Sequence, residues 1–285
     1  MPAYLRPTST AEAVTALKSN AYTVLAGGTD FYPMHVGKPC RDDVLDITAI
    51  LGLKGIREAD GGWRIGATTT WSELLTTPLP AWFDGVKEAA REVGGAQIQN
   101  AGTIAGNLCN ASPAADGVPP LLTIDASVEL LAAGGVETMP LAEFLVGNRR
   151  TRLRPEQLVT AIMVPKPEGA RAAGHFRKLG SRRYLVISFV MASAALVVDA
   201  EGRIVTAAVA VGACSPVARR LPLLETALLG QPVHGGLGAL AGRQHLEPLA
   251  PINDVRASVE YRCDAALTLV RRTLDELATR LSLLP

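Results

Sequence analysis

Two short stretches of this sequence combine glycine with small residues in a pattern that suits the binding of an anion. The first is LAGGTD at residues 25–30, and the second is TIAGN at residues 103–107. Each offers main-chain N–H groups and a hydroxyl but no lysine or arginine. Glycine lets successive amides converge on an anion because it has no Cβ. Both stretches therefore predict a phosphate site built from backbone dipoles.

Each stretch taken alone is also typical of a tight turn after a strand, because Gly-Gly is common in turns. Two such stretches in one chain favour a ligand with two phosphates, such as FAD, held between loops that are distant in sequence. Neither stretch matches the G-x-G-x-x-G dinucleotide fingerprint or the G-x-x-x-x-G-K-[ST] phosphate loop. The glycines at 235, 236 and 238 also miss the dinucleotide spacing.

The sequence shows no constellation for acid–base, nucleophilic or metal catalysis, so no catalytic side chain is assigned. The histidines have no metal-ligand spacing, and the cysteines at 40, 109, 214 and 263 include no C-x-x-C pair. This predicts neither a zinc site nor an iron–sulfur cluster on this chain. Cys109 is interpreted as a small buried thiol. We therefore expect a cofactor to supply the chemistry while the protein binds and orients it.

The composition indicates a folded protein that binds its ligands locally. The 285 residues are enough for two or three compact units, and 48% of them are hydrophobic. The 28 basic and 27 acidic side chains create no net field for nucleic acid or an anionic membrane. The start of the sequence lacks the features of a signal peptide, and no apolar run approaches the ~20 residues of a membrane helix. These features predict a cytoplasmic protein without membrane insertion.

The elements before the second stretch follow from local signals. Residues 9–20 are predicted to form a helix, because STAE at its start has the form of a capping box. Residues 22–25 and 43–47 are predicted strands, and the first of them leads directly into the first stretch. Asp30 either contacts the ligand or caps the turn at 31–34, and the cap is favoured for its side chain.

The middle of the chain mixes a hairpin with short helices. The DGG turn at 60–62 predicts a hairpin between Ile56 and Ile65, and a capping box at 70–73 opens a short helix. A further helix is predicted over 82–93. The prolines at 113, 119 and 120 predict that the segment 100–122 is ordered but not helical. Strands are predicted at 127–132 and 158–164, before a linker at 165–167.

The last third of the sequence differs from the rest in its pattern of apolar residues. Residues 186–198 are apolar and rich in β-branched residues, and after a turn at 199–202 the strand 204–211 is predicted to pair with them in antiparallel fashion. Helices are predicted over 217–229 and 257–281. In the second helix a stripe of apolar residues is interpreted as core packing; it consists of Ala266, Val270, Leu274, Leu277 and Leu281.

The combination of these motifs resembles the FAD-binding medium subunit of molybdenum hydroxylases, the group of xanthine dehydrogenase and carbon monoxide dehydrogenase. AGGTD and TIAGN carry the resemblance, together with SPAAD at 112–116 and PPLL at 119–122. It continues in family order through FRKLGSRR at 176–183, VGACSP at 211–216 and NDVRASVEYR at 253–262. It thus covers essentially the whole chain.

The resemblance implies an α+β fold in two domains. Residues 1–170 are expected to form a two-lobed FAD-binding domain of the PCMH or vanillyl-alcohol-oxidase-like type, with lobes of about 1–54 and 55–170. Residues 171–285 are expected to form a smaller α+β domain of the carbon monoxide dehydrogenase flavoprotein type, with an antiparallel sheet.

The resemblance also implies which residues contact FAD. Asp116 is expected to accept hydrogen bonds from ribityl or ribose hydroxyls, because a carboxylate repels a diphosphate. Lys178, Arg182 and Arg183 form a basic cluster on an expected loop, which is either a solvated face or lies near the flavin. The full set of expected contacts is Leu25, Ala26, Gly27, Gly28, Thr29, Asp30, Thr103, Ile104, Ala105, Gly106, Asn107, Asp116, Val159 and Lys178. Valine at Gly28 or Gly106 is expected to block a phosphate oxygen while the fold survives.

The sequence departs from the family pattern at two places. Ala105 stands where a second glycine of a TIGGN motif is usual, which is tolerable if the residue has a negative φ. The run after Arg183 is YLVIS rather than an acidic one.

By this resemblance the chain is expected to be the medium subunit of a heterotrimer. A large molybdopterin subunit would hydroxylate a heterocycle, aldehyde or similar molecule, and a small [2Fe–2S] subunit would pass the electrons to FAD on this chain. The final acceptor would be NAD, oxygen, a quinone or another carrier. Two alternatives stay open: a free-standing FAD-dependent oxidoreductase and a non-catalytic assembly subunit.

Overall fold

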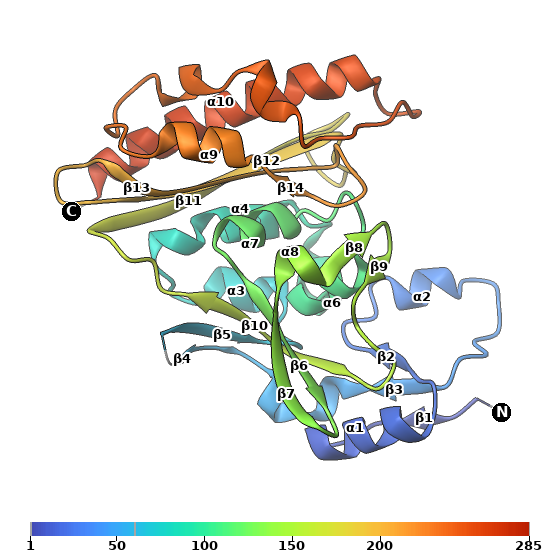
Figure 1. The fold of residues 1–285 in the computed structure, drawn as a ribbon. Coiled ribbons are helices and arrows are strands. Elements are labelled where there is room, and N and C mark those ends of the chain that lie inside the picture. Colours follow the sequence, from blue (N-terminus) through green and yellow to red (C-terminus); the bar gives the residue numbers. More distant parts are fainter. Residues whose placement is uncertain (1, 60, 285) are drawn as a thin grey trace. The chain divides into compact units, whose positions relative to one another are not determined.

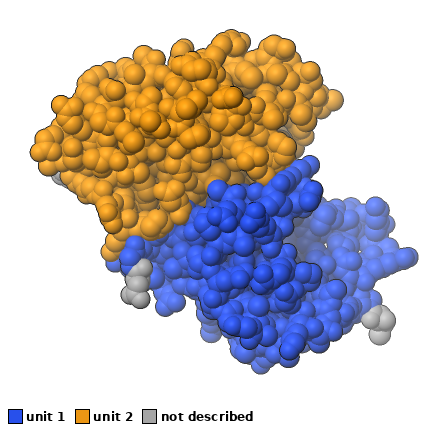
Figure 2. All heavy atoms as spheres, viewed as in Figure 1, with its two compact units in different colours: residues 1–77, 96–111, 126–164 blue, residues 78–95, 112–125, 165–285 orange. Residues whose placement is uncertain are grey.

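A computed structural model describes residues 2–59 and 61–284, and the chain forms two compact units. Unit 1 contains residues 1–77, 96–111 and 126–164, and unit 2 contains residues 78–95, 112–125 and 165–285 (Figure 2). The chain therefore passes from one unit to the other several times before residue 165. No helix among the described residues has the length and apolar character needed to cross a membrane.

Unit 1 begins with a small parallel sheet of strand order β1-β3-β2 (Figure 1). Its strands are β1 (Tyr4–Leu5), β2 (Thr23–Leu25) and β3 (Val44–Asp46). The predicted helix is α1 (Thr10–Ser19), and the predicted N-cap Ser9 accepts a hydrogen bond from the amide of Glu12 at 3.2 Å. The carboxylate of Glu12 accepts from the amide of Thr8 instead of closing the box at Ser9. The 3₁₀ turns η1 (Ile47–Ala49) and η2 (Leu51–Leu53) follow β3.

A second sheet in unit 1 has the order β4-β5-β10-β6-β7. The predicted hairpin is confirmed, since Ile56 pairs with Ile65, although Asp60 of its turn lies outside the described residues. The predicted capping box at Thr70 and Glu73 is also confirmed at the start of α3 (Trp71–Thr76). The strands are β4 (Ile56–Ala59), β5 (Gly62–Gly66), β6 (Ser127–Ala132), β7 (Gly135–Pro140) and β10 (Leu158–Pro165). Between the last two lie α8 (Leu141–Phe144), β8 (Leu145–Gly147) and β9 (Arg150–Thr151).

The segment 100–122 is largely helical, so the prediction of non-helical chain was wrong. It contains the end of α5 (Ala96–Ala101), α6 (Ile104–Asn110) and most of α7 (Val118–Thr123). Pro119 and Pro120 stand in the first turn of α7. The amide that proline lacks has no intrahelical partner in that turn, so proline is tolerated there.

Unit 2 is built on an antiparallel sheet with the order β11-β12-β13-β14. The predicted antiparallel pair is confirmed as β12 (Val190–Val198) and β13 (Ile204–Gly212). It is flanked by β11 (Arg171–Leu179), although Lys178 near its end was expected on a loop, and by β14 (Arg219–Arg220). The 25-residue helix α10 (Val259–Leu283) and α9 (Pro222–Leu228) cover one face. The helices α4 (Asp84–Glu92) and α7 cover the other face (Figure 1).

The core of unit 2 lies between this sheet and α10. The predicted stripe on α10 is confirmed, because all five of its side chains are buried against alternate residues of β12 and β13. The 3₁₀ turns η3 (Ala81–Phe83), η4 (Leu237–Leu240) and η5 (Arg243–Leu246) complete the unit. The predicted helix over 217–229 is shorter than expected, because residues 219–220 pair with β13 before α9 begins.

The NDVRASVEYR motif fixes the beginning of α10. Arg262 is buried, with 4% of its side chain exposed, and donates to the carbonyl oxygens of Phe189 and Ala213 at 2.5 and 2.9 Å. It also donates to Asp254 at 2.8 Å. Asp254 accepts from the amide of Arg256, which is the main reason why its pKa is lowered to about 2. The motif is therefore a structural anchor of unit 2.

Candidate functional site

The two glycine-containing stretches lie against each other within unit 1. We call residues 25–30 the first loop and residues 101–107 the second loop. A Cβ added to Gly27 would lie 1.9 Å from the carbonyl oxygen of Ala101, and one added to Gly102 would lie 3.3 Å from Thr29 Oγ1. The backbones can approach this closely because these positions carry no side chain.

The first loop leaves a row of amides available to a ligand. Among the described residues, no carbonyl or side chain accepts a hydrogen bond from the amides of Gly27, Gly28 or Thr29. Gly28 has a φ of 69°, and a Cβ there would lie 2.4 Å from the ring of Tyr32. A side chain at Gly28 would therefore clash with Tyr32. The valine variant is thus expected to disturb the loop itself, and not only to block a phosphate oxygen.

The second loop uses most of its amides inside the protein. Thr103 is the N-cap of α6 and its hydroxyl accepts from the amide of Gly106 at 3.0 Å, while Asn107 donates its amide to the Thr103 carbonyl. The amide of Ile104 donates to Thr69. Within the described part of the chain, the hydroxyl proton of Thr103 and the amide of Ala105 have no acceptor. A Cβ on Gly106 would lie 2.7 Å from the capping hydroxyl, so valine there would disturb the cap of α6.

Ala105 fits its position without strain. It lies in the first turn of α6, is 3% exposed and is not among the residues with positive φ. The condition under which alanine can replace the family's glycine is therefore met. The side chains of Leu25, Ile104 and Ala105 are buried in the core, so these residues present only their backbone.

Among the described side chains of unit 1, two buried polar atoms have no hydrogen-bond partner, and both lie at the loops. They are Asn107 Oδ1 and Asp30 Oδ2. Asp30 makes no side-chain bond to the turn that follows it, so the favoured cap was wrong. Its Oδ2 faces Arg149 Nη1 at 3.6 Å instead. A buried polar atom without a partner is costly, which marks Asn107 Oδ1 as a candidate for ligand contact, and Asp30 Oδ2, which has only the long ion pair with Arg149, as a second one.

Arg149 is a residue of this region that the sequence did not indicate. It stands between β8 and β9 with a φ of 52°, and it donates its amide to Ala111 and its guanidinium to Asn110 at 2.7 Å. It thereby holds the end of α6 next to Asp30. No local signal identifies it, because the contact joins segments that are far apart in sequence.

Asp116 and Lys178 form a buried pair in unit 2. Lys178 lies on β11, and its ammonium is 2.7 Å from Asp116 Oδ2, with 6% and 10% of the two side chains exposed. Ser188, which the sequence analysis missed, donates to Asp116 Oδ1 at 2.6 Å. Burial raises the pKa of Asp116, and the ammonium opposes that rise. The solvated-face hypothesis was wrong for Lys178, whereas Arg182 and Arg183 are exposed.

The remaining candidates are more isolated. Val159 lies in β10 beside a bulge and is 5% exposed. Burial raises the pKa of the Cys109 thiol to about 12, which keeps it protonated and unreactive.

Comparison with known protein families divides the chain into two regions. The family described as "FAD binding domain in molybdopterin dehydrogenase" matches residues 1–167. The family described as "CO dehydrogenase flavoprotein C-terminal domain" matches residues 175–277.

Individual relatives agree with these families. The xanthine dehydrogenase FAD-binding subunit of Escherichia coli O157:H7 is 28% identical over 278 residues, which cover 96% of this chain and 94% of the relative. A 6-hydroxypseudooxynicotine dehydrogenase complex subunit alpha of Paenarthrobacter nicotinovorans is 31% identical, covering 88% and 85%. Among solved structures, a carbon monoxide dehydrogenase chain from Hydrogenophaga pseudoflava is similar with a TM-score of 0.87 and 26% identity, covering 98% of both chains.

Proposed function

Because this chain belongs to the family of FAD-binding domains of molybdopterin dehydrogenases, we propose that the two loops of unit 1 hold the diphosphate of FAD. The chain is an FAD-binding electron-transfer subunit of a multi-subunit molybdenum hydroxylase. When bound, FAD accepts electrons singly and releases them as a pair.

The observation that carries the proposal is the contact between the loops. It places the unpartnered amides of Gly27, Gly28 and Thr29 in the same part of unit 1 as the Thr103 hydroxyl and Asn107 Oδ1. The donors suit a diphosphate, because backbone amides stabilise negative charge without a counter-ion. Asn107 Oδ1 and Asp30 Oδ2 can only accept, so they suit the hydroxyls of the cofactor rather than its phosphates. The residues present therefore fit FAD.

The other expected contacts are proposals that rest on the resemblance. Asp116 and Lys178 are bonded to each other, and we assign them to cofactor contact because they stand at the family's positions. Val159 is assigned on the same ground. The proposed partners are a small [2Fe–2S] subunit and a large molybdopterin subunit, and the proposed acceptor is NAD, oxygen or a quinone.

A cofactor inventory of the complex that co-purifies with this chain tests the function. We expect one FAD per copy of this chain, with iron and molybdenum on the partner chains. FAD on a solitary chain that turns over a substrate by itself would replace this function with that of a free-standing oxidoreductase. A complex without flavin would leave only an assembly role.

The variant Asn107→Leu tests the site itself. It removes a buried acceptor that has no partner in the protein, so the FAD-free form should unfold at a higher temperature than wild type. FAD should bind more weakly, by roughly tenfold for one lost hydrogen bond. A higher unfolding temperature together with weaker FAD binding identifies Asn107 as a ligand contact, because loss of a structural residue would lower the unfolding temperature. An unchanged FAD dissociation constant would remove Asn107 from the site.

A further inference from the structure

Unit 2 contains a cationic pocket that shares one residue, Lys178, with the proposed FAD contacts and is otherwise lined by residues outside that set. Its volume is about 610 Å³, and it opens between α4, α10 and the edge strand β11. Its lining contains two acidic residues, Glu88 and Glu92. It also contains six basic residues, which are Arg91, Arg177, Lys178, Arg182, Arg183 and Arg272. Lys178 is paired with Asp116 and Arg177 with Glu276, whereas Arg272 makes no ion pair within the described residues. The pocket therefore carries an excess of positive charge.

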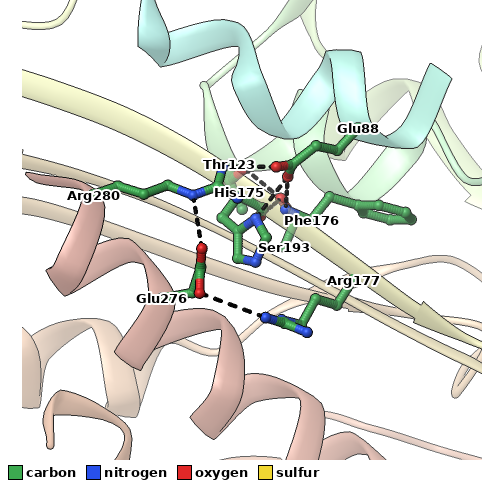
Figure 3. Close-up of polar contacts among 8 residues, drawn as sticks. All are labelled: Glu88, Thr123, His175, Phe176, Arg177, Ser193, Glu276 and Arg280. Carbon is green, nitrogen blue, oxygen red and sulfur yellow. Dashed lines mark hydrogen bonds and ion pairs between the residues drawn. The ribbon is translucent and has the colours of Figure 1, made fainter. Parts of the chain in front are cut away.

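Among the described side chains, two buried nitrogens on residues of this pocket have no hydrogen-bond partner. They are His175 Nε2 and Arg177 Nε, both on residues that line it. The two residues stand at i and i+2 of β11, so their side chains leave the same face of the strand about 7 Å apart. Figure 3 shows both side chains extending from β11 to the same side. The side chain of His175 is only 6% exposed, so the unmet hydrogen-bonding capacity of Nε2 is costly without a ligand.

A network of alternating charges holds these two side chains in place (Figure 3). His175 Nδ1 lies 2.7 Å from Glu88, and Glu88 also accepts from Arg280 at 2.7 Å. Glu276 joins Arg280 to Arg177, at 3.3 and 3.8 Å respectively. Because the carboxylate of Glu88 can only accept, Nδ1 of His175 carries the proton of that bond. Nε2 of the neutral ring is then an acceptor, while Arg177 Nε–H is a donor.

We propose that this pocket binds the phosphate group of a small phosphorylated molecule or of free phosphate. A hydrogenphosphate ion offers an O–H for His175 Nε2 and anionic oxygens for Arg177 Nε–H at the same time. Guanidinium groups match phosphate oxygens in a bidentate geometry, and Arg177 and Arg272 supply them from β11 and α10. The volume leaves room for an organic group attached to the phosphate.

Calorimetric titration of the purified, FAD-loaded protein with inorganic phosphate, AMP and sulfate tests the proposal. Phosphate or AMP should bind with one site per chain, and sulfate should bind more weakly, because it has no proton to donate to His175 at neutral pH. If AMP binds more tightly than inorganic phosphate, the ligand is a phosphate ester. If the two bind equally, the ligand is free phosphate. The absence of saturable binding by both would overturn the proposal.

Three variants localise the site. Arg272→Gln and Arg177→Lys should each weaken phosphate binding by roughly tenfold, as expected for one charge-assisted hydrogen bond. Arg219→Gln, an exposed arginine of unit 2 outside the pocket, should leave it unchanged. FAD content should stay constant in all three. Release of FAD by phosphate, or loss of FAD in the pocket variants, would show that the pocket belongs to the flavin site and would overturn the proposal.

A second, independent cluster lies in unit 1, after the first loop. One ligand atom each of His35, Cys40 and Asp42 lies within 4.8 Å of the other two. His35 Nδ1 is 2.8 Å from the carbonyl oxygen of Phe31, and Nε2 is 3.5 Å from Asp42 Oδ2. The carbonyl only accepts, so Nδ1 carries the proton and the lone pair of Nε2 in the neutral ring points to a carboxylate. Two acceptors that face each other repel unless a proton or a metal cation lies between them.

We infer that His35, Cys40 and Asp42 form a zinc site. The three groups are a nitrogen, a sulfur and an oxygen, which zinc accepts together, and three protein ligands leave one position for water. A histidine that donates its other N–H to a backbone carbonyl is the usual arrangement of a zinc ligand. Ligand atoms around tetrahedral zinc are roughly 3.5 Å apart, the distance already present between His35 Nε2 and Asp42 Oδ2, so only the distances to Cys40 Sγ have to shorten.

Zinc analysis of protein stripped with a chelator, loaded with Zn²⁺ and dialysed tests this site. Wild type should retain one zinc per chain, and Cys40→Ser and His35→Gln should each retain less, with at least a tenfold loss of affinity. Cys263→Ser, which changes a partly buried cysteine of unit 2, should retain the wild-type amount. Equal retention by Cys40→Ser and wild type would overturn the inference and leave a His35–Asp42 ion pair.

Discussion

Lys178 and Asp116 form a buried ion pair with an N–O distance of 2.7 Å between β11 and the segment that precedes α7. The ammonium also donates to the carbonyls of Glu92 and Val186, and Ser188 donates to the second oxygen of the carboxylate. Every charge of the pair is therefore solvated by the protein, as a buried pair requires.

Removing one partner of this pair should be more damaging than removing both. Lys178→Met leaves a buried carboxylate unpaired and should lower the free energy of unfolding by about 3–5 kcal/mol. The double variant Lys178→Met/Asp116→Leu should lose less, because no buried charge remains. Urea unfolding of the wild type, both single variants and the double variant measures the coupling. Additive losses would mean that the two side chains do not stabilise each other.

Gly27→Ala should destabilise unit 1 and weaken FAD binding together. The added Cβ would lie 1.9 Å from the carbonyl oxygen of Ala101, so the two loops must separate, at a cost of about 1–3 kcal/mol. Gly134→Ala is the matched control, since a Cβ there meets open space and should change stability by less than about 0.5 kcal/mol. Thermal unfolding and FAD titration of both variants provide the comparison. Normal flavin affinity in Gly27→Ala would refute a role for the loop contact.

Glu88 should contribute to stability in a pH-dependent manner. Burial alone raises its pKa, but hydrogen bonds from His175, the amide of Phe176 and Arg280 outweigh burial and lower the pKa below its ordinary value of 4.5. The folded state then favours the carboxylate, so the stabilisation is complete above pH 4.5 and is lost as the pH falls through the folded-state pKa. The difference in unfolding free energy between wild type and Glu88→Gln should therefore shrink below pH 4.5. A difference that grows on acidification would contradict this account.

Arg262→Met should be among the most damaging substitutions in α10. It leaves two carbonyl oxygens without this donor, at a cost of about 1–3 kcal/mol each, and removes one of the donors to Asp254. Arg272→Met, on the same helix but exposed, should change stability by less than about 0.5 kcal/mol in phosphate-free buffer. Chemical unfolding of both variants measures the contrast. Similar losses would indicate that helix propensity, rather than the anchor, decides the effect.

Local signals predicted the elements that depend on neighbouring residues. The caps at Ser9 and Thr70, the hairpin at 60–62 and the pair β12–β13 all follow from spacing, turn chemistry and β-branched composition. Two proline positions misled the sequence analysis, because the same residue that breaks a helix interior is tolerated in its first turn.

Contacts between distant segments were beyond the reach of the sequence pattern. The two glycine stretches were identified from composition, but the closeness of Gly27 to Ala101 depends on how α5 packs. Arg149, Ser188 and the cluster of His35 with Asp42 gave no periodic or spacing signal, because each acts through the tertiary fold. The family motifs located Lys178 and Arg262, yet only the structure shows that both are buried in ion pairs.

The interleaving of the two units in the sequence has a consequence for synthesis on the ribosome. Unit 1 is complete in sequence at residue 164, but α4 and α7 emerge earlier and pack on β11, β12 and β13, which emerge later. The apolar faces of these two helices therefore stay exposed until β11, β12 and β13 have been synthesised. Unit 1, in contrast, can fold as soon as residue 164 is available. A nascent chain arrested near residue 165 should bind chaperones through these helices. A C-terminal fragment that begins at residue 165 would lack α4 and α7 and would expose the face of the sheet that they cover.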